Sequence, residues 1–324
     1  MTNNFTPKRN GYNKNSKPKY TPAEYADHKQ NEKDKVFQLI DDTAVAVVSN
    51  SEKFMSFLDT QARMDRYSIA NALLINAQLP EATQLKDFAG WGEDNIRVKK
   101  GSKSISILEP VEYAKNDGTT GISYNVKKVF DVSQTNGKRK PAPTANHNPK
   151  ELVSVMIDSS PVNVEISDSL SMPNLMAQYD NEKQTIYILR GVQDSVALAQ
   201  SMALELAFAQ LSIDSDTYNR RELGHTAACV AYMLCKKFGV DSKVFTVDRI
   251  PVPLKNAEAK DIRTELGRMR SATTEIYNRV ANELYRQKQA RSKDMERYGG
   301  VMNVGRTLSL VHNRQRAEHY APSA

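Results

Sequence analysis

Hydrophobic residues recur every three or four positions over much of the first third of the chain. Between Val36 and Met64 this spacing predicts one or two helices, and a further helix begins near Tyr67 and is ended by Pro80. The apolar face of this further helix comprises Tyr67, Ala70, Leu73, Leu74 and Ala77. We expect these helices to pack against one another through their apolar faces.

Apolar and polar residues alternate in the region that follows. Residues 105–111 (ISILEPV) form a predicted strand with Ile105 and Ile107 on one face, and residues 123–132 (SYNVKKVFDV) form a second strand. The intervening segment 116–121 (NDGTTG) has the composition of a turn. The pattern therefore predicts a β-hairpin.

The second half of the chain combines a strand with an unusually apolar helix. Residues 184–191 (QTIYILRG) form the predicted strand. Residues 196–211 (VALAQSMALELAFAQL) follow as a helix in which Glu205 is the only charged residue. A helix without a polar face is typical of a protein core, so we expect it to be buried on most sides.

Two more helices are predicted after it. Residues 221–239 end with Lys236, Lys237 and Gly239, a typical helix C-terminus. Residues 259–284 carry an apolar stripe at a spacing of three and four. Because this stripe is short for a coiled coil, we favour a helix docked on the second domain over one that pairs with a partner.

Segments without hydrophobic periodicity divide the chain. Residues 1–35 and 292–324 are basic and irregular, so both are predicted tails, the first of them disordered. Residues 139–150 are rich in Pro, Asn and Lys and form a predicted linker. Two folded domains remain, 36–138 and 151–291, and the fold class is α+β, with an N-terminal α/β domain followed by a helix-rich domain.

The positive charge of the chain is concentrated in its first half. The 324 residues carry a net charge of +7, of which residues 1–150 contribute +6 and the remainder +1. A basic module beside a neutral one suggests that the first module meets a polyanion. The alternative is a general bias toward solubility.

The sequence also bears on the location of the protein. Apolar runs such as 43–48 (TAVAVV) are far shorter than the roughly 20 residues of a membrane-spanning helix, and the N-terminus has no signal-peptide core. Cys229 and Cys235 sit in an apolar helical pattern, which favours buried thiols over a disulfide. We therefore expect a cytoplasmic protein without a membrane partner.

Several residue types in the basic half suit contact with nucleic acid. Asn71 and Gln78 are seven positions apart, so both amides project from one side of a helix. The single tryptophan and a cluster of cations at Gly101 follow, and aromatic residues such as Tyr25 are interleaved with the basic tail. The candidate contacts are Arg66, Tyr67, Asn71, Gln78, Trp91, Arg97, Lys99, Lys100 and Lys103.

These candidates also allow structural interpretations. Lys99, Lys100 and Lys103 are the expected phosphate contacts, but lysines beside a glycine also occur in ordinary solvated turns. Tyr67 and Trp91 are the candidate stacking residues, and Trp91 equally suits the core.

Four blocks in the first domain resemble one known family. The blocks are YSIANALLINAQLPEAT, then Trp91, then VKKGSKSISILEPV, then KVFDVSQTNGK, and together they lie within 61–138. They resemble the N-terminal domain of ArdC-type antirestriction proteins of conjugative plasmids and related mobile elements. The resemblance implies that residues 36–138 bind single-stranded DNA in an antirestriction or conjugation context.

The second domain of that family is a zincin-like metallopeptidase, and here its metal motif is degenerate. The family pattern HELAH corresponds to LELAF, so Leu204 and Phe208 stand where the zinc histidines belong and only Glu205, the general-base position, remains. Thr226 and Ala228 stand in place of the acidic residues of the later helix. Because zinc hydrolysis needs about three N, O or S ligands, the resemblance implies a pseudoenzyme without metal or other cofactor.

Three alternatives remain beside this interpretation. His225 and Cys229 are spaced as metal ligands on one helix face, with Glu222 one turn earlier, so a peptidase with non-standard ligands is conceivable. Glu205 is either neutralised by burial or paired with Arg220 or Arg221. Finally, the second domain could be a scaffold that binds a protein partner.

Overall fold

The structure is a computed structural model that describes residues 21–115, 117–138, 147–213 and 217–318, the last 26 of these by their backbone only. The first 20 residues of the predicted N-terminal tail and most of the predicted linker lie outside the described residues. Two predicted tails are partly wrong. Residues 22–35 belong to the first helix, and the last helix continues through the predicted C-terminal tail to Glu318.

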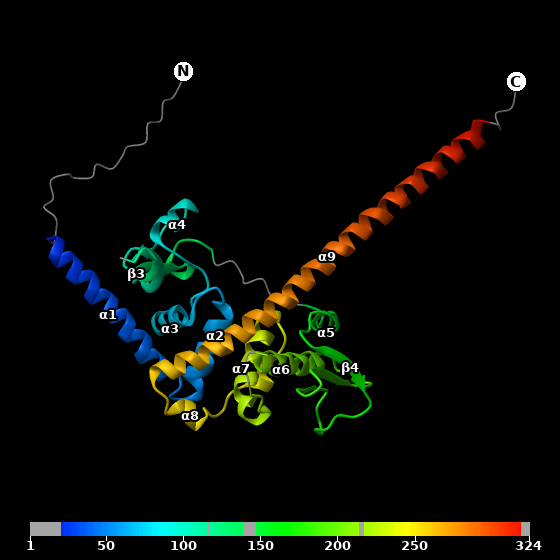
Figure 1. Ribbon diagram of the computed structural model, residues 1–324. Helices are drawn as coiled ribbons and strands as arrows, with labels where there is room; N and C mark the ends of the chain where they lie inside the picture. Colours follow the sequence, from blue (N-terminus) through cyan, green and yellow to red (C-terminus); the bar gives the residue numbers. More distant parts are fainter. Residues whose placement is uncertain (1–20, 116, 139–146, 214–216, 319–324) are drawn as a thin grey trace, which may run out of the picture.

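Three helices open the chain and confirm the helices predicted from apolar spacing (Figure 1). They are α1 (Pro22–Val47), α2 (Ser51–Arg63) and α3 (Ile69–Gln78). A polar side chain caps each N-terminus. At Thr21 the cap is reciprocal, because the Thr21 hydroxyl accepts from the backbone N–H of Glu24 and the Glu24 carboxylate accepts from the backbone N–H of Thr21. The buried residues Val36, Ile40, Ala44 and Val47 place the apolar face of α1 in the core.

The predicted hairpin is confirmed as part of a small antiparallel sheet. Its strands are β1 (Leu85–Lys86), β2 (Ile105–Ala114) and β3 (Thr120–Asp131), in the order β1-β3-β2. The short helices α4 (Phe88–Glu93) and η1 (Val132–Gln134) flank the sheet. The base of the hairpin is buried, whereas the distal half exposes Val111, Tyr113, Ile122 and Tyr124. The distal half of the hairpin therefore extends from the core into solvent.

The second half contains another three-stranded sheet, now mixed, beside a group of helices (Figure 1). The sheet has the order β4 (Asn163–Ser167), β6 (Thr185–Leu189), β5 (Ala177–Asp180), with β4 parallel and β5 antiparallel to β6. The remaining elements are α5 (Pro149–Asp158), α6 (Ser195–Ile213), α7 (Arg220–Phe238), η2 (Lys243–Phe245), α8 (Val252–Lys255) and α9 (Ala259–Glu318). The fold class is α+β, as predicted.

Helix α6 is the central helix of this half. It packs against α5, α7, α9 and β5, which confirms the predicted burial. By length and composition alone α6 would also suffice to cross a membrane, but 61% of that stretch is buried in the interior. The predicted end of α7 is confirmed, and Gly239 caps the helix in the left-handed conformation with a φ of 72°.

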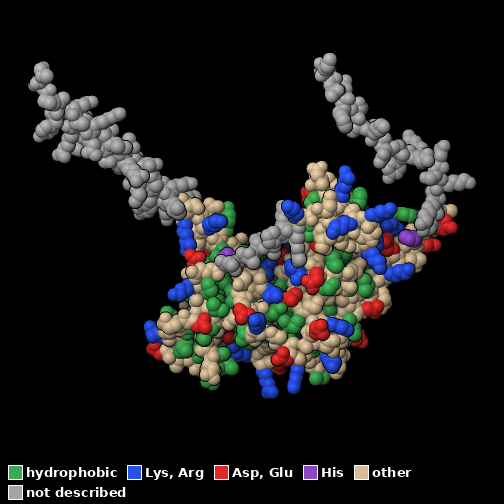
Figure 2. All heavy atoms as spheres, turned by 180° about the vertical axis from the view of Figure 1, so that it is seen from behind, with side chains coloured by type: hydrophobic (Ala, Val, Ile, Leu, Met, Phe, Trp, Pro, Cys, Tyr) green, Lys and Arg blue, Asp and Glu red, His purple; other side chains and the backbone are tan. Residues whose placement is uncertain are grey.

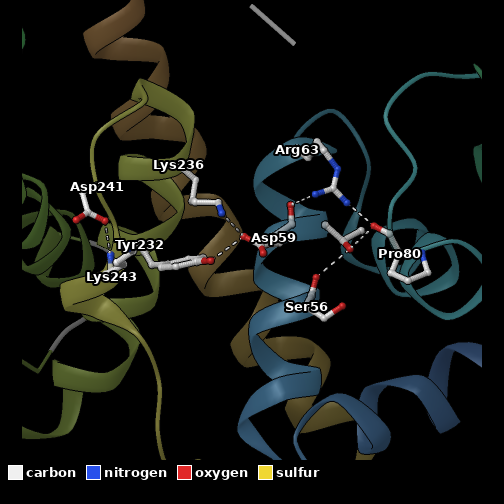
Figure 3. Close-up of polar contacts among 9 residues, drawn as sticks. Ser56, Asp59, Arg63, Pro80, Tyr232, Lys236, Asp241 and Lys243 are labelled. Carbon is white, nitrogen blue, oxygen red and sulfur yellow. Dashed lines mark hydrogen bonds and ion pairs between the residues drawn. The ribbon is translucent and has the colours of Figure 1, made fainter. Parts of the chain in front are cut away.

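The two halves of the chain share one hydrophobic core, because buried residues of α1–α3 and α5–α9 belong to a single cluster. Figure 3 shows polar contacts where α2 meets α7: Asp59 accepts a hydrogen bond of 2.7 Å from the Tyr232 hydroxyl and pairs with Lys236 at 2.9 Å. On the far side of α2, the Arg63 Nε donates to the carbonyl oxygen of Ala82 at 2.9 Å. The two predicted domains are thus joined through α2.

Candidate functional site

The basic segment between α4 and β2 is a tight turn held against the end of β3. The backbone N–H of Lys99 donates to the carbonyl oxygen of Gln134 at 2.9 Å, and Val98 forms a bridge with Thr135. Gly101 has a φ of +86°, a conformation that side chains with a Cβ rarely adopt. The turn therefore has a defined backbone on which its cations are displayed.

The four cations of this turn are exposed and uncompensated. Within the described part of the chain, no carboxylate forms an ion pair with Arg97, Lys99, Lys100 or Lys103. The Nζ of Lys99 donates to the carbonyl oxygen of Ser133 at 3.0 Å, a neutral partner. Unpaired surface cations attract phosphate groups, so the turn suits a polyanion.

Asn71 and Gln78 have a different role from the predicted contact with nucleic acid. The side-chain amide of Asn71 donates to the carbonyl oxygen of Leu108 at 2.8 Å and accepts from its N–H at 2.7 Å. Gln78 makes the same pair of bonds with Ser106, at 3.0 and 2.9 Å. An amide carries a donor and an acceptor like a peptide group, so both side chains cap the outer edge of β2. We therefore correct the prediction that these amides face nucleic acid.

Trp91 lies in the core, which decides between its two interpretations. Its side chain is 1% exposed, and its indole N–H donates to the carbonyl oxygen of Phe130 at 2.9 Å. The prediction that its ring is a stacking surface is therefore wrong. Instead, Trp91 anchors α4 to β3.

Arg66 and Tyr67 lie in the connection between α2 and α3. Arg66 is exposed, whereas Tyr67 is half-buried and packs against a small apolar cluster that includes Ile75 and Ile107. Burial raises the pKa of the Tyr67 hydroxyl, and nearby Lys127 acts in the opposite direction. Tyr67 also lines a hollow of about 540 Å³ beside Lys86 and Pro110. Its ring edge is therefore partly accessible, but most of its surface serves packing.

In the second half, Glu205 is fully engaged. Its two carboxylate oxygens accept hydrogen bonds of 2.8 and 2.6 Å from the guanidinium of Arg220, and one of them also accepts 2.7 Å from the backbone N–H of Tyr179. The side chain of Glu205 is 1% exposed. Of the two sequence alternatives, pairing with Arg220 is confirmed. Burial alone would lower the pKa of Arg220, but the bonds to Glu205 outweigh it and the pKa lies above its ordinary value.

The positions that the sequence resemblance assigns to a metal site are occupied by packed or hydrogen-bonded side chains. Phe208 is buried, and the Arg220 guanidinium carbon lies 4.0 Å from the centre of its ring. Leu204 packs half-buried against the main core, and Thr226 donates its hydroxyl hydrogen to Glu265. Among the described residues, no group of three or more His, Cys, Asp or Glu is placed to hold a metal ion.

The alternative ligands His225, Cys229 and Glu222 do not converge. The Sγ of Cys229 lies 3.8 Å from the Nε2 of His225, but burial raises the pKa of the Cys229 thiol far above its ordinary value and lowers that of His225. The carboxylate of Glu222 instead accepts from Asn219 at the start of α7. Glu222 and His225 line a hollow of about 510 Å³, and Cys229 does not.

One surface that the sequence prediction missed lies beside α1. Tyr25, which the sequence places with the basic tail, is on α1 and is 54% exposed. Lys29 and Lys33 follow it at four-residue intervals, so all three lie on one face of the helix. The four-residue spacing can be read in the sequence. The helix itself was not predicted there, because this part of the chain has no apolar stripe.

Comparisons with known proteins support the fold. No protein-family model matches the chain, and no curated protein sequence matches it. The structure is similar to the Mn(II)-bound crystal structure of the antirestriction protein ArdC from plasmid R388, with a TM-score of 0.51 and 14% identity over 76% of this chain and 98% of that chain. It also matches the metal-free ArdC structure, with a TM-score of 0.45 and 16% identity over 67% of this chain and 86% of that one. The fold is therefore ArdC-like.

Proposed function

We propose that this protein binds single-stranded DNA through its N-terminal half, in an antirestriction-related role of a mobile element. The observation that carries the proposal is the turn at Gly101, where Arg97, Lys99, Lys100 and Lys103 are exposed without a carboxylate partner among the described residues. The ArdC-like fold supports the antirestriction context, because the neighbouring structures are antirestriction proteins.

The chemistry of this turn favours binding with little sequence preference. Lysine and arginine side chains neutralise phosphates and release the counterions that surround the strand. The amides of Asn71 and Gln78, which could otherwise read base edges, are taken by the backbone of β2. We therefore expect affinity that falls steeply with salt and depends weakly on base sequence.

We further propose that the second half is a pseudoenzyme without peptidase activity. Leucine and phenylalanine at positions 204 and 208 donate no lone pair, so a metal ion would lack its first ligands. Glu205 would have to leave Arg220 before it could act on a water molecule. The guanidinium of Arg220 is the positive charge that compensates this carboxylate in the interior.

The test is a titration of the purified protein with labelled oligonucleotides. Single-stranded and double-stranded forms of one sequence are compared by fluorescence anisotropy at low and moderate salt. The proposal expects tighter binding of the single strand and a marked loss of affinity at the higher salt concentration. Failure to bind either form at low salt would reject it.

A further inference from the structure

A groove runs between the N-terminal part of α1 and strand β3. It has a volume of about 580 Å³. One wall contains Tyr25, Lys29 and Lys33 of α1, and the other contains Tyr124 and Lys127 of β3. Figure 2 shows Lys and Arg side chains gathered, with some Asp and Glu among them, on the side of the molecule where α1 begins.

The strand β3, which forms one wall of this groove, has a free edge. Asn71 and Gln78 bond to the backbone of Leu108 and Ser106, so these even-numbered residues of β2 face away from β3. Val126 lies directly opposite Leu108 in the antiparallel pair. Because opposite residues are either both bonded to each other or both turned outward, the N–H and C=O of Val126 also point away from β2. In the described part of β3, only Phe130 and Asp131 have a partner strand on this side, which is β1.

The two edges of the sheet therefore differ. The outer edge of β2 is closed by two side-chain amides and carries Pro110, which has no N–H to offer. The edge of β3 keeps peptide groups at alternate residues, among them Tyr124 and Val126, and both residues line the groove. The groove thus offers backbone donors and acceptors along one wall.

The walls carry the two kinds of side chain that bind unpaired nucleotides. Tyr25 and Tyr124, on opposite walls, are 54% and 41% exposed. The Nζ of Lys33 donates to the Ser123 hydroxyl at 3.2 Å, which is a neutral partner. Lys29 pairs with Glu32 at 3.2 Å in an exposed contact, and such pairs are weak enough for a phosphate to compete.

Acidic residues are also present in the groove, and they hold the lysines in place. Glu109 pairs with Lys127 at 2.6 Å. Glu32 pairs with Lys128 at 2.8 Å in addition to Lys29. Three lysines against two glutamates leave the lining with a positive charge.

Lys128 connects this groove to the basic turn. Its Nζ donates to the Ser106 hydroxyl at 2.8 Å, and Ser106 follows Lys103 of the turn by three residues at the start of β2. Its other partner, Glu32, belongs to α1 and lines the groove. These contacts mark a course from the end of the turn, past Lys128, to the groove.

We propose that a single DNA strand follows this course from the basic turn into the groove, with its phosphates near Lys29 and Lys33 and its bases against Tyr25 and Tyr124. This inference rests on the proposed function and adds its location. Only unpaired bases present free faces to an aromatic ring, so the groove selects single strands over duplex.

The test uses the full chain and a fluorescently labelled oligothymidine. Tyr25→Ala and Tyr124→Ala are each expected to weaken binding at least about fivefold, because stacking on an aromatic ring is lost. Tyr25→Phe and Tyr124→Phe are expected to keep the affinity, since phenylalanine retains the stacking face. Tyr285→Ala, at a 66% exposed tyrosine of α9, is the matched control and is expected to change nothing.

The outcomes separate this inference from the proposed function. If the unmodified protein binds no oligothymidine, the proposed function fails. The groove is overturned by a different result, in which the unmodified protein binds and charge reversal at Lys99 and Lys100 weakens binding, but both alanine variants keep full affinity. In that case the proposed DNA binding stands. Photo-crosslinking of a bromodeoxyuridine oligonucleotide, mapped by mass spectrometry, gives a direct readout: a crosslink at Tyr25 or Tyr124 supports the groove.

Discussion

The guanidinium of Arg220 donates hydrogen bonds of 2.8 and 2.6 Å to the two carboxylate oxygens of Glu205, across the interface between α6 and α7. Glu205 belongs to α6, and Arg220 is the first residue of α7. A buried carboxylate without a partner is costly, so this pair keeps the remaining acid compatible with an apolar core.

The first prediction concerns this pair. Arg220→Ala leaves the buried carboxylate of Glu205 with a single backbone donor, Tyr179, and we expect a loss of about 3 kcal/mol in the free energy of unfolding. Urea unfolding followed by circular dichroism measures it. Arg221→Ala removes an exposed neighbouring arginine and should stay within about 0.5 kcal/mol of the unmodified protein. Equal stability of the two variants would contradict the structural role of Arg220.

The second prediction concerns metal. Because Leu204 and Phe208 offer no ligand atoms, addition of Zn²⁺ or Mn²⁺ should leave the melting temperature of the protein unchanged. Metal analysis of the purified protein should find well below one equivalent of zinc. A stabilising shift that His225→Ala and Cys229→Ala abolish would instead support a site with non-standard ligands.

The third prediction concerns the basic turn. The double charge reversal Lys99→Glu/Lys100→Glu should weaken binding of a single-stranded oligonucleotide and reduce the slope of log affinity against log salt by about 1.4, the value for two lost phosphate contacts. Lys243→Glu/Lys255→Glu is the matched control, because it changes the net charge equally at exposed lysines of the second half. Equal affinities of both double variants would place the phosphate contacts elsewhere.

The fourth prediction separates a structural role from a binding role at Asn71. Asn71→Ala leaves the N–H and C=O of Leu108 without their partner at a buried site, so we expect a loss of roughly 1 to 3 kcal/mol in stability. The folded variant should bind oligonucleotides as before. Asn163→Ala, at an exposed asparagine of β4, controls for the change of residue type and should be nearly neutral.

The fifth prediction concerns pH. Burial acts to raise the pKa of Asp131, but hydrogen bonds from the backbone N–H groups of Thr83, Ser133 and Gln84 outweigh it, so the pKa is lowered in the folded protein. Asp131 therefore stabilises the fold above its unfolded pKa of about 3.8, and this contribution is lost as the pH falls through the lower folded value.

The variant Asp131→Asn tests this sign. It should be less stable than the unmodified protein at pH 7, and the difference should shrink below a pH of about 3.8. Thermal melts between pH 7 and pH 3 follow the difference, with Asp248→Asn as the exposed control. A difference that grows toward low pH would reverse the assignment.

Local signals in the sequence predicted most of the elements. Apolar spacing and Pro80 located α3, alternation and a turn located the hairpin, and Gly239 marked the end of α7. The start of α1 was missed although Thr21 and Glu24 form a capping box, because no apolar stripe follows until Val36. The extension of α9 was missed because residues 292–318 lack a regular apolar stripe and include three glycines, which are poor helix formers.

The candidate site was less predictable than the elements. The cations of the turn at Gly101 are exposed as expected, because a polar turn has no other place than the surface. The polar groups of Asn71, Gln78 and Trp91 each found a backbone partner that lies 28 to 39 residues away in the chain. Pairings at such separations are not encoded in any local spacing.

The sequence by itself determined which chemistry is possible. It put Leu204 and Phe208, which offer no ligand atoms, on either side of Glu205 in one helix, and it concentrated positive charge in the first half. Only the tertiary structure decided where polar groups are used, by closing the edge of β2 with two amides, pairing Arg220 with Glu205 and leaving the edge of β3 open beside α1. The physical reason is that a buried donor or acceptor must be satisfied by whichever partner packing brings within reach, and packing is a property of the whole fold.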